Sequence, residues 1–332
     1  MAAAAEDPSY LALMRTGALA QRAAEAVARL RSCRLCPRRC GVDRLKDARG
    51  FCRTGRRAIV SSAVPHLGEE PPISGRRGSG TVFFTHCNLA CKFCQNFEIS
   101  QQGQGDEADA ETLAGDMLHL QELGCHNINL VTPSHVGPQI LEALALAAER
   151  GLRLPLVWNS GGYDGLETLG LFDGIVDIYM PDLKYGRNED GARLSNAPDY
   201  ADRARQALRE MYRQVGDLVV DADGVAVRGL LVRHLVLPRD AAGTDACLEF
   251  LARELSTGIG LSLMAQYRPA FRAGEEPDVA RPLTPAEYRR AMELLEALGF
   301  EHAFVQHLES AEDWVPDFEQ EDPFKRWRGE DA

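Results

Sequence analysis

From residue 80 onward the chain alternates short apolar segments with amphipathic ones, and this alternation leaves few folds open to it. Six segments have the length and apolar content of β-strands: residues 81–85, 127–131, 154–158, 175–180, 230–237 and 261–265. Segments with helical periodicity lie between or after them, near residues 110–123, 137–150, 164–171, 199–214, 243–254 and 285–298. Strands that alternate with covering helices form a parallel sheet. We therefore predict an α/β fold, a partial (βα)6 TIM-like barrel rather than a complete barrel of eight units.

The regions on either side of this alternation differ from it in composition. Residues 1–79 combine helical sequence, a cysteine-rich stretch and a Pro- and Gly-rich passage, and are expected to form an N-terminal helical, Cys-rich extension. Residues 80–300 form the barrel, with a hairpin expected at residues 217–228. Residues 301–332 are expected to form an acidic C-terminal tail or lid. The aromatic residues of this tail are Trp314, Phe318, Phe324 and Trp327.

Length and charge set further limits. The 332 residues fit two domains or one α/β barrel, and a content of 45% hydrophobic and 26% charged residues is that of a globular protein. The net charge of −12 gives no general basic field, so we expect no nucleic-acid partner. No apolar run approaches the roughly 18 residues of a membrane span, and Glu6 and Asp7 stand where a signal peptide would be basic. We expect a cytoplasmic protein with no membrane partner.

Three cysteines, Cys87, Cys91 and Cys94, follow the first predicted strand with the spacing C-x3-C-x2-C. In barrel-like α/β folds, reactive groups lie on the loops that follow the strands. Thiolates are the usual ligands of a [4Fe–4S] cluster, and three of them leave one iron open. That iron would accept the amino and carboxylate groups of S-adenosylmethionine (SAM), and Phe93 would cover the cluster and the adenine side. The competing interpretation is a zinc site or a set of buried thiols.

A second group comprises Cys33, Cys36, Cys40 and Cys52, with the spacing C-x2-C-x3-C-x11-C. Four thiolates complete the coordination of either Zn²⁺ or an iron–sulfur cluster, and the spacing does not choose between them. A second cluster would relay electrons to the first, whereas zinc would brace the N-terminal helices onto the barrel. The alternative is four unbound buried thiols.

The triplet, with Gln95-Asn96 and Ile99-Ser100 after it, resembles the radical SAM superfamily. More closely, the chain resembles the pyruvate formate-lyase activating enzyme-related branch, often called PflX-like, over nearly its whole length. The further motifs that carry this resemblance are Cys33-x2-Cys36-Pro37-x2-Cys40, Gly50-x-Cys52 and the segments at residues 68–75, 127–133 and 179–185.

The resemblance implies a partial barrel of the radical SAM type, with SAM bound across the strand ends. It implies reductive cleavage of SAM to a 5′-deoxyadenosyl radical that abstracts hydrogen, an oxidoreductase chemistry. The electron source would be a low-potential donor such as flavodoxin or ferredoxin. The hydrogen donor would be a glycyl radical enzyme, another protein or a small molecule.

The same resemblance suggests residues that hold SAM. The family binds the amino group of SAM with a Gly-Gly-Glu-like turn after the second strand, where this chain has Thr132-Pro133-Ser134-His135. Backbone carbonyls there and the Ser134 hydroxyl would accept from an ammonium, so Thr132 and Ser134 are candidate contacts.

Other candidates follow later strands. Lys184, in Asp182-x-Lys184, and Arg233 are candidates for binding the methionine carboxylate, the alternative for each being an ordinary salt bridge. Asn159 and Ser160 are candidates for the ribose hydroxyls, the alternative being a plain loop-capping role. The candidates for adenine or substrate at the end of the last predicted strand are Gln266, Tyr267 and Arg268.

Two other functional classes compete with the radical SAM hypothesis. In one, both cysteine groups bind zinc and the chain is a structural or adaptor protein. In the other, the same cluster serves a SAM-dependent methyltransferase. Iron and sulfide content separates the first class from an iron–sulfur enzyme, and the products formed from SAM separate the second.

Overall fold

The computed structural model describes residues 7–308, 315–318, 320 and 322–325. All six predicted strands are present, and each neighbouring pair among them runs parallel, which confirms the predicted α/β fold. The bounds of these strands are β2 Ser79–Phe84, β4 Ile128–Val131, β5 Leu156–Ser160, β6 Ile178–Pro181, β8 Ala226–Leu235 and β9 Gly260–Met264. Strands β2, β5, β6 and β9 are buried along their whole length, as expected for a sheet covered on both faces.

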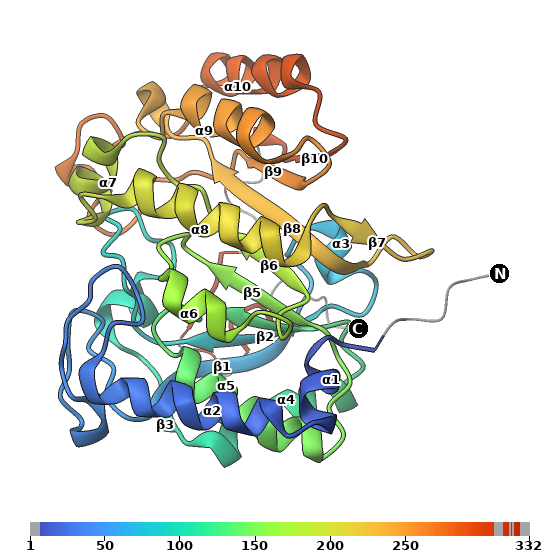
Figure 1. Cartoon of the computed structure of the whole chain (residues 1–332). Coiled ribbons are helices and arrows are strands. Elements are labelled where there is room, and N and C mark those ends of the chain that lie inside the picture. Colours follow the sequence, from blue (N-terminus) through green and yellow to red (C-terminus); the bar gives the residue numbers. More distant parts are fainter. Residues whose placement is uncertain (1–6, 309–314, 319, 321, 326–332) are drawn as a thin grey trace.

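Four further strands extend this sheet, whose order is β10-β9-β8-β6-β5-β4-β2-β1-β3 (Figure 1). Strand β10 (His302–Val305) adds a parallel edge on β9. At the other edge, β1 (Ala58–His66) pairs antiparallel with β2, and β3 (Asp106–Ala108) pairs antiparallel with β1. Strand β7 (Val219–Val220) forms the predicted hairpin with β8. Part of the region expected to be the N-terminal extension is therefore a strand of the main sheet.

The six predicted helices are present close to their expected bounds. They are α4 Ala110–Glu122, α5 Gly137–Glu149, α6 Leu166–Leu171, α8 Tyr200–Val215, α9 Thr244–Phe250 and α10 Pro285–Leu298. The remaining α-helices are α1 Tyr10–Arg15, α2 Ala18–Ala28, α3 Pro71–Ser74 and α7 Asn188–Ser195. Helix α2 packs along α5, so the N-terminal helices cover the barrel helices from outside (Figure 1). No helix in the described ranges is long and apolar enough to cross a membrane.

Two aromatic residues of the C-terminal tail are buried against the sheet. The Phe318 ring lies 5.6 Å from that of Phe83 on β2, and the Phe324 ring lies 4.0 Å from that of His66 on β1. Trp314 and Trp327 lie outside the described residues. The described part of the tail therefore packs on the first two strands, at His66, the last residue of β1, and at Phe83, near the carboxyl end of β2.

Candidate functional site

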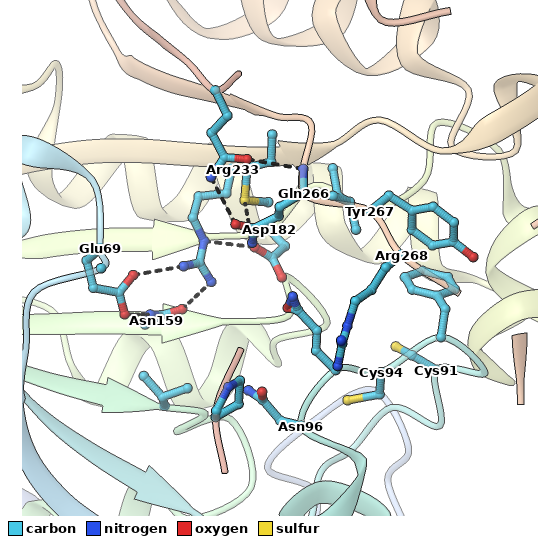
Figure 2. A pocket seen from close by; sticks show the side chains of 18 of the residues that line it. Glu69, Cys91, Cys94, Asn96, Asn159, Asp182, Arg233, Gln266, Tyr267 and Arg268 are labelled. Carbon is cyan, nitrogen blue, oxygen red and sulfur yellow. Dashed lines mark hydrogen bonds and ion pairs between the residues drawn. The ribbon is translucent and has the colours of Figure 1, made fainter. Parts of the chain in front are cut away.

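A cavity of about 230 Å³ opens at the carboxyl ends of the parallel strands (Figure 2). Its wall brings together residues from separate elements, as is usual at this end of a barrel. Nine predicted residues contribute to it, among them Cys91 and Cys94 from the loop after β2, Asn159 from β5, Lys184 from the loop after β6, and Arg233 from β8. The other predicted residues in the wall are Phe93, Gln266, Tyr267 and Arg268.

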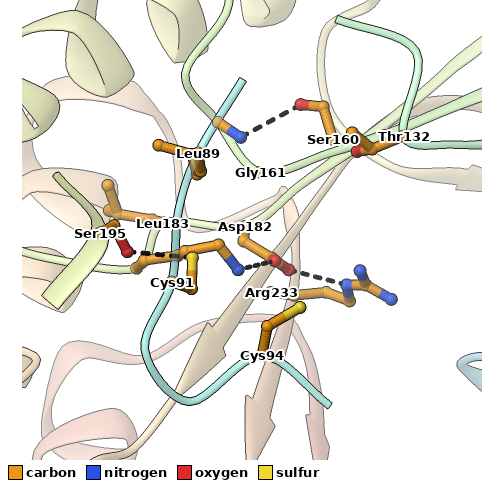
Figure 3. Close-up of polar contacts among 12 residues, drawn as sticks. Leu89, Cys91, Cys94, Thr132, Ser160, Gly161, Asp182, Leu183, Ser195 and Arg233 are labelled. Carbon is orange, nitrogen blue, oxygen red and sulfur yellow. Dashed lines mark hydrogen bonds and ion pairs between the residues drawn. The ribbon is translucent and has the colours of Figure 1, made fainter. Parts of the chain in front are cut away.

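The loop after β2 holds the three cysteines close to one another. Cys91 Sγ accepts a hydrogen bond of 2.9 Å from Ser195 Oγ (Figure 3), and Cys87 Sγ accepts one of 3.4 Å from the Leu89 amide. Burial and the neighbouring Cys91 thiol raise the pKa of Cys87 to about 12 and that of Cys94 to about 11. The Cys87 and Cys94 thiols, whose pKa values burial raises, become thiolates readily only beside a cation.

The arrangement of these thiols is informative about which metal group they fit. Among the described residues, no three His, Cys, Asp or Glu side chains are placed so that they could hold one metal ion. Thiolates around a single zinc stand about 3.8 Å apart, because each Zn–S bond is about 2.3 Å long and the geometry is tetrahedral. In a four-iron cluster each thiolate binds its own iron, so the sulfur atoms stand farther apart. The triplet supplies three thiols, which is the ligand set of a four-iron cluster with one open iron.

A buried charge network forms the wall opposite the cysteines. Asp182 pairs with Lys184 Nζ through Oδ2 and with Arg233 Nε through Oδ1 at 3.0 Å (Figures 2 and 3). Burial opposes ionisation of Asp182, but these two cations together hold its pKa below the usual value. Burial likewise opposes the charge of Lys184, whereas Asp182 and the nearby Cys91 raise its pKa.

The remaining nitrogens of Arg233 are also engaged. Nη1 donates to Glu69 Oε2 at 3.1 Å, and Nη2 donates to Asn159 Oδ1 at 2.7 Å (Figure 2). Each nitrogen of this guanidinium therefore already has an acceptor. Lys184 differs, because one ammonium has three donors and its only side-chain partner among the described residues is Asp182.

Glu69 and Glu70 belong to the site although the sequence analysis did not single them out as ligands. Glu69 accepts from Asn129 Nδ2 at 2.9 Å, and burial raises the pKa of both carboxyl groups. Glu70 Oε2 is buried without a hydrogen-bond partner among the described residues. The signal in the sequence was an acidic pair directly before two prolines, within the motif at residues 68–75.

Four residues predicted for this site lie outside the described pocket wall: Cys87, Thr132, Ser134 and Ser160. Among the described residues of the pocket wall, Thr132 and Ser134 are absent. The Thr132 hydroxyl donates to the Asn159 carbonyl at 2.8 Å, and Ser134 is buried. Ser160 Oγ accepts from the Gly162 amide at 3.2 Å (Figure 3). It also donates to Asp164 Oδ2, so it organises the turn after β5.

The aromatic part of the wall is rigidly packed. The Phe93 ring meets Tyr267 edge-on at 5.7 Å and Tyr185 edge-on at 6.5 Å. Phe93 and Tyr267 both line the pocket, so they present an apolar surface beside Cys91 and Cys94. Such a surface suits a flat aromatic group.

The second group of cysteines is also brought together. Cys33, Cys36, Cys40 and Cys52 line one small cavity. Cys40 is exposed, and the other three are buried.

Comparison with known proteins identifies a relative. No family model matches the chain. The uncharacterized protein MJ0674 of Methanocaldococcus jannaschii is 32% identical over 273 residues, which cover 80% of this chain and 75% of that protein. The chain belongs to the family of MJ0674.

Solved structures give a weaker likeness. A radical SAM methyltransferase from Sphaerobacter thermophilus is 17% identical, with 70% of this chain and 68% of that chain covered and a TM-score of 0.43. The radical SAM methyltransferase TsrM from Kitasatospora setae is 16% identical, with 70% and 55% covered and a TM-score of 0.47. Likeness at this level assigns no activity to this relative of MJ0674, and its function has to be argued from its site.

Proposed function

We propose that this chain is a radical SAM enzyme. Cys87, Cys91 and Cys94 would hold a [4Fe–4S] cluster with one open iron. When bound, this cluster supplies the electron that cleaves SAM into methionine and a 5′-deoxyadenosyl radical, which abstracts hydrogen from a substrate. The observation that supports the proposal is the position of the triplet: three thiols on one loop at the carboxyl end of β2, with Cys91 and Cys94 facing a pocket of about 230 Å³.

The charged wall of the pocket provides for the amino-acid end of SAM. Lys184 lies near Cys91 and has donors left for a carboxylate. The unpartnered oxygen of Glu70 is an acceptor for an ammonium, which supplies the acidic group that the turn at residues 132–135 lacks. Arg233 holds Asp182, Glu69 and Asn159 in place, so we assign it a positioning role.

The apolar wall provides for the adenine and for exclusion of water. Phe93 and Tyr267 offer aromatic contact, and Phe83 and Phe324 close the side of the pocket that the C-terminal tail covers. A radical reacts with whatever it meets, so a dry wall of this kind directs it to the bound substrate.

The finer assignment rests on the motifs that resemble the PflX-like branch. Within the proposal, the enzyme is an oxidoreductase of the cytoplasm that takes electrons from a flavodoxin or ferredoxin. Its hydrogen donor is a glycine of a glycyl radical enzyme, and no nucleic acid takes part.

Anaerobic product analysis tests the proposed function. The protein is reconstituted with iron and sulfide, reduced with dithionite, and supplied with SAM. We expect methionine and 5′-deoxyadenosine. S-adenosylhomocysteine as the main product would favour a methyltransferase, and a colourless protein that contains zinc but no sulfide would favour a structural or adaptor protein.

Matched variants sharpen this experiment. Cys94→Ala removes a thiol of the triplet, and Cys247→Ala removes a thiol that is fully buried in α9, outside the pocket. We expect the first variant to lose formation of 5′-deoxyadenosine and the second to keep it. Equal activity in both variants would remove Cys94 from the site.

A further inference from the structure

The four N-terminal cysteines share their cavity with positively charged side chains. Arg38, Arg39 and Arg44 line the same small cavity as the thiols. Arg44 is only 1% exposed, and it donates to the Gly55 carbonyl at 3.0 Å and to the His135 carbonyl at 2.7 Å. Both of these partners are neutral.

Arg44 therefore lacks a carboxylate counter-ion. Within the described ranges it forms no ion pair with an acidic side chain at 4.0 Å or less, whereas its Nη1 contacts Cys33 Sγ at 3.8 Å. An uncompensated buried charge costs several kcal/mol, so a guanidinium in this position requires an anion nearby. Thiolates are the anions that the cavity offers, and metal coordination keeps buried cysteines in that form.

Hydrogen-bond donors and a buried histidine surround the sulfur atoms of this cavity. His135 also lines the cavity, is buried, and has no hydrogen-bond partner for Nδ1 among the described residues. Amide and guanidinium donors reach the sulfur atoms, as the Phe51 amide does to Cys40 Sγ at 3.4 Å. Such donors tune iron–sulfur clusters.

One residue joins this cavity to the triplet. Asn88 is 1% exposed and follows Cys87 directly. Its side chain forms a hydrogen bond with the Cys36 thiol, and its Oδ1 lies 3.8 Å from Cys87 Sγ. Arg38 Nε donates to the Asn88 carbonyl at 2.9 Å, which fastens the N-terminal loop to the loop of the triplet.

We propose that Cys33, Cys36, Cys40 and Cys52 hold a second iron–sulfur cluster and that Asn88 bridges it to the catalytic one as an electron path. Cys40 is exposed and Cys36 faces Asn88, so the path leads from the surface to the pocket. A low-potential electron-transfer protein gives one electron to the second cluster, which passes it through the Cys36–Asn88–Cys87 contact and returns to its oxidised state. SAM is the final acceptor, and its C–S bond breaks. This electron path rests on the proposed function, but the existence of the second cluster does not.

Metal analysis of a variant without the triplet tests the second cluster by itself. We expect Cys87→Ala/Cys91→Ala/Cys94→Ala, reconstituted anaerobically, to retain about half of the iron and sulfide of the wild type and a reducible cluster signal in electron paramagnetic resonance. A metal-free or zinc-loaded variant would overturn the proposal. Because this variant has no catalytic site, its result is independent of whether the wild type cleaves SAM.

The path is tested by comparing two reductants. Dithionite is small and reaches both clusters, whereas reduced flavodoxin or ferredoxin docks at the surface. We expect Cys36→Ser and Asn88→Asp to lower the ratio of protein-driven to dithionite-driven SAM cleavage, and Cys247→Ala to leave this ratio unchanged. We also expect the magnetic interaction between the two reduced clusters to be lost in Cys36→Ser. An unchanged ratio in both variants would overturn the electron path, and absence of cleavage with dithionite in the wild type would refute the proposed function instead.

Discussion

The variant Arg233→Ala tests whether Arg233 compensates the buried carboxylates of the pocket wall. In Arg233→Ala, Asp182 keeps Lys184 as a partner, so Glu69 is the carboxylate left without its cation. The side chains of Arg233 and Glu69 are only 17% and 8% exposed, so the case is closer to a buried pair than to a surface pair. Breaking a buried pair by removing one partner costs about 3–5 kcal/mol. We expect a loss of unfolding free energy of this size at pH 8.

The loss of stability in Arg233→Ala should depend on pH, and its direction follows from the pKa of Glu69. Burial already raises the pKa of Glu69 in the presence of Arg233. Without the Arg233 cation, the pKa of Glu69 in the folded protein rises further. A carboxyl group whose pKa is higher in the folded state than in the unfolded state destabilises the fold as the pH rises through its folded-state pKa. The loss in Arg233→Ala should therefore be smaller at pH 5 than at pH 8, because the lower pH favours the protonated form of Glu69.

Urea unfolding followed by circular dichroism at both pH values measures these free energies. Glu69→Gln in the Arg233→Ala background removes the unpaired charge and should recover about 1–3 kcal/mol at pH 8. Arg209→Ala, which breaks an exposed pair with Glu254, is the control and should cost no more than about 1 kcal/mol. A loss that is independent of pH and is not recovered in the double variant would refute the reasoning.

Three further predictions concern the metal sites and SAM. Cys87→Ala, Cys91→Ala and Cys94→Ala should each abolish SAM cleavage with unfolding midpoints close to that of Cys247→Ala, and cleavage by the triple variant would contradict the assignment of the catalytic site. Lys184→Ala should weaken SAM binding by about 1.5–3 kcal/mol in calorimetry while the cluster absorption spectrum persists, and an unchanged affinity would leave Lys184 as a partner of Asp182 alone. Cys36→Ser should speed proteolysis within the N-terminal segment, because metal binding is coupled to local folding, and an unchanged cleavage rate would show that these thiols do not brace it.

The elements of the barrel were predictable because their signals are local. The apolar period of residues 137–150 predicted a helix, and the structure has α5 at Gly137–Glu149. Each covering helix buries the stripe that its own sequence displays, so neighbouring residues suffice to recognise it. The triplet is local in the same way, because a single loop carries all three thiols.

Strand β1 was not predicted, because its sequence does not carry the local signal of the parallel strands. The sequence at Ala58–His66 lacks the continuous apolar run of the parallel strands. In the structure, most of these residues are accordingly only half-buried. Its antiparallel pairing with β2 depends on how residues 67–78 turn the chain between the two strands, and no local pattern in the sequence records that pairing.

The pocket wall depended on contacts between distant segments. Glu69 and Arg233 are 164 residues apart, and an acidic pair before two prolines reads in sequence as a solvated loop. Only the packing of that segment over the strand ends buries its carboxylates beside Arg233. The contact of Asn88 with Cys36 has the same origin: the spacing within each cysteine group is a property of the chain, but the docking of one group onto the other is a property of the fold. Burial and charge pairing are decided by what surrounds a side chain in space, and the order of residues along the chain does not contain that information locally.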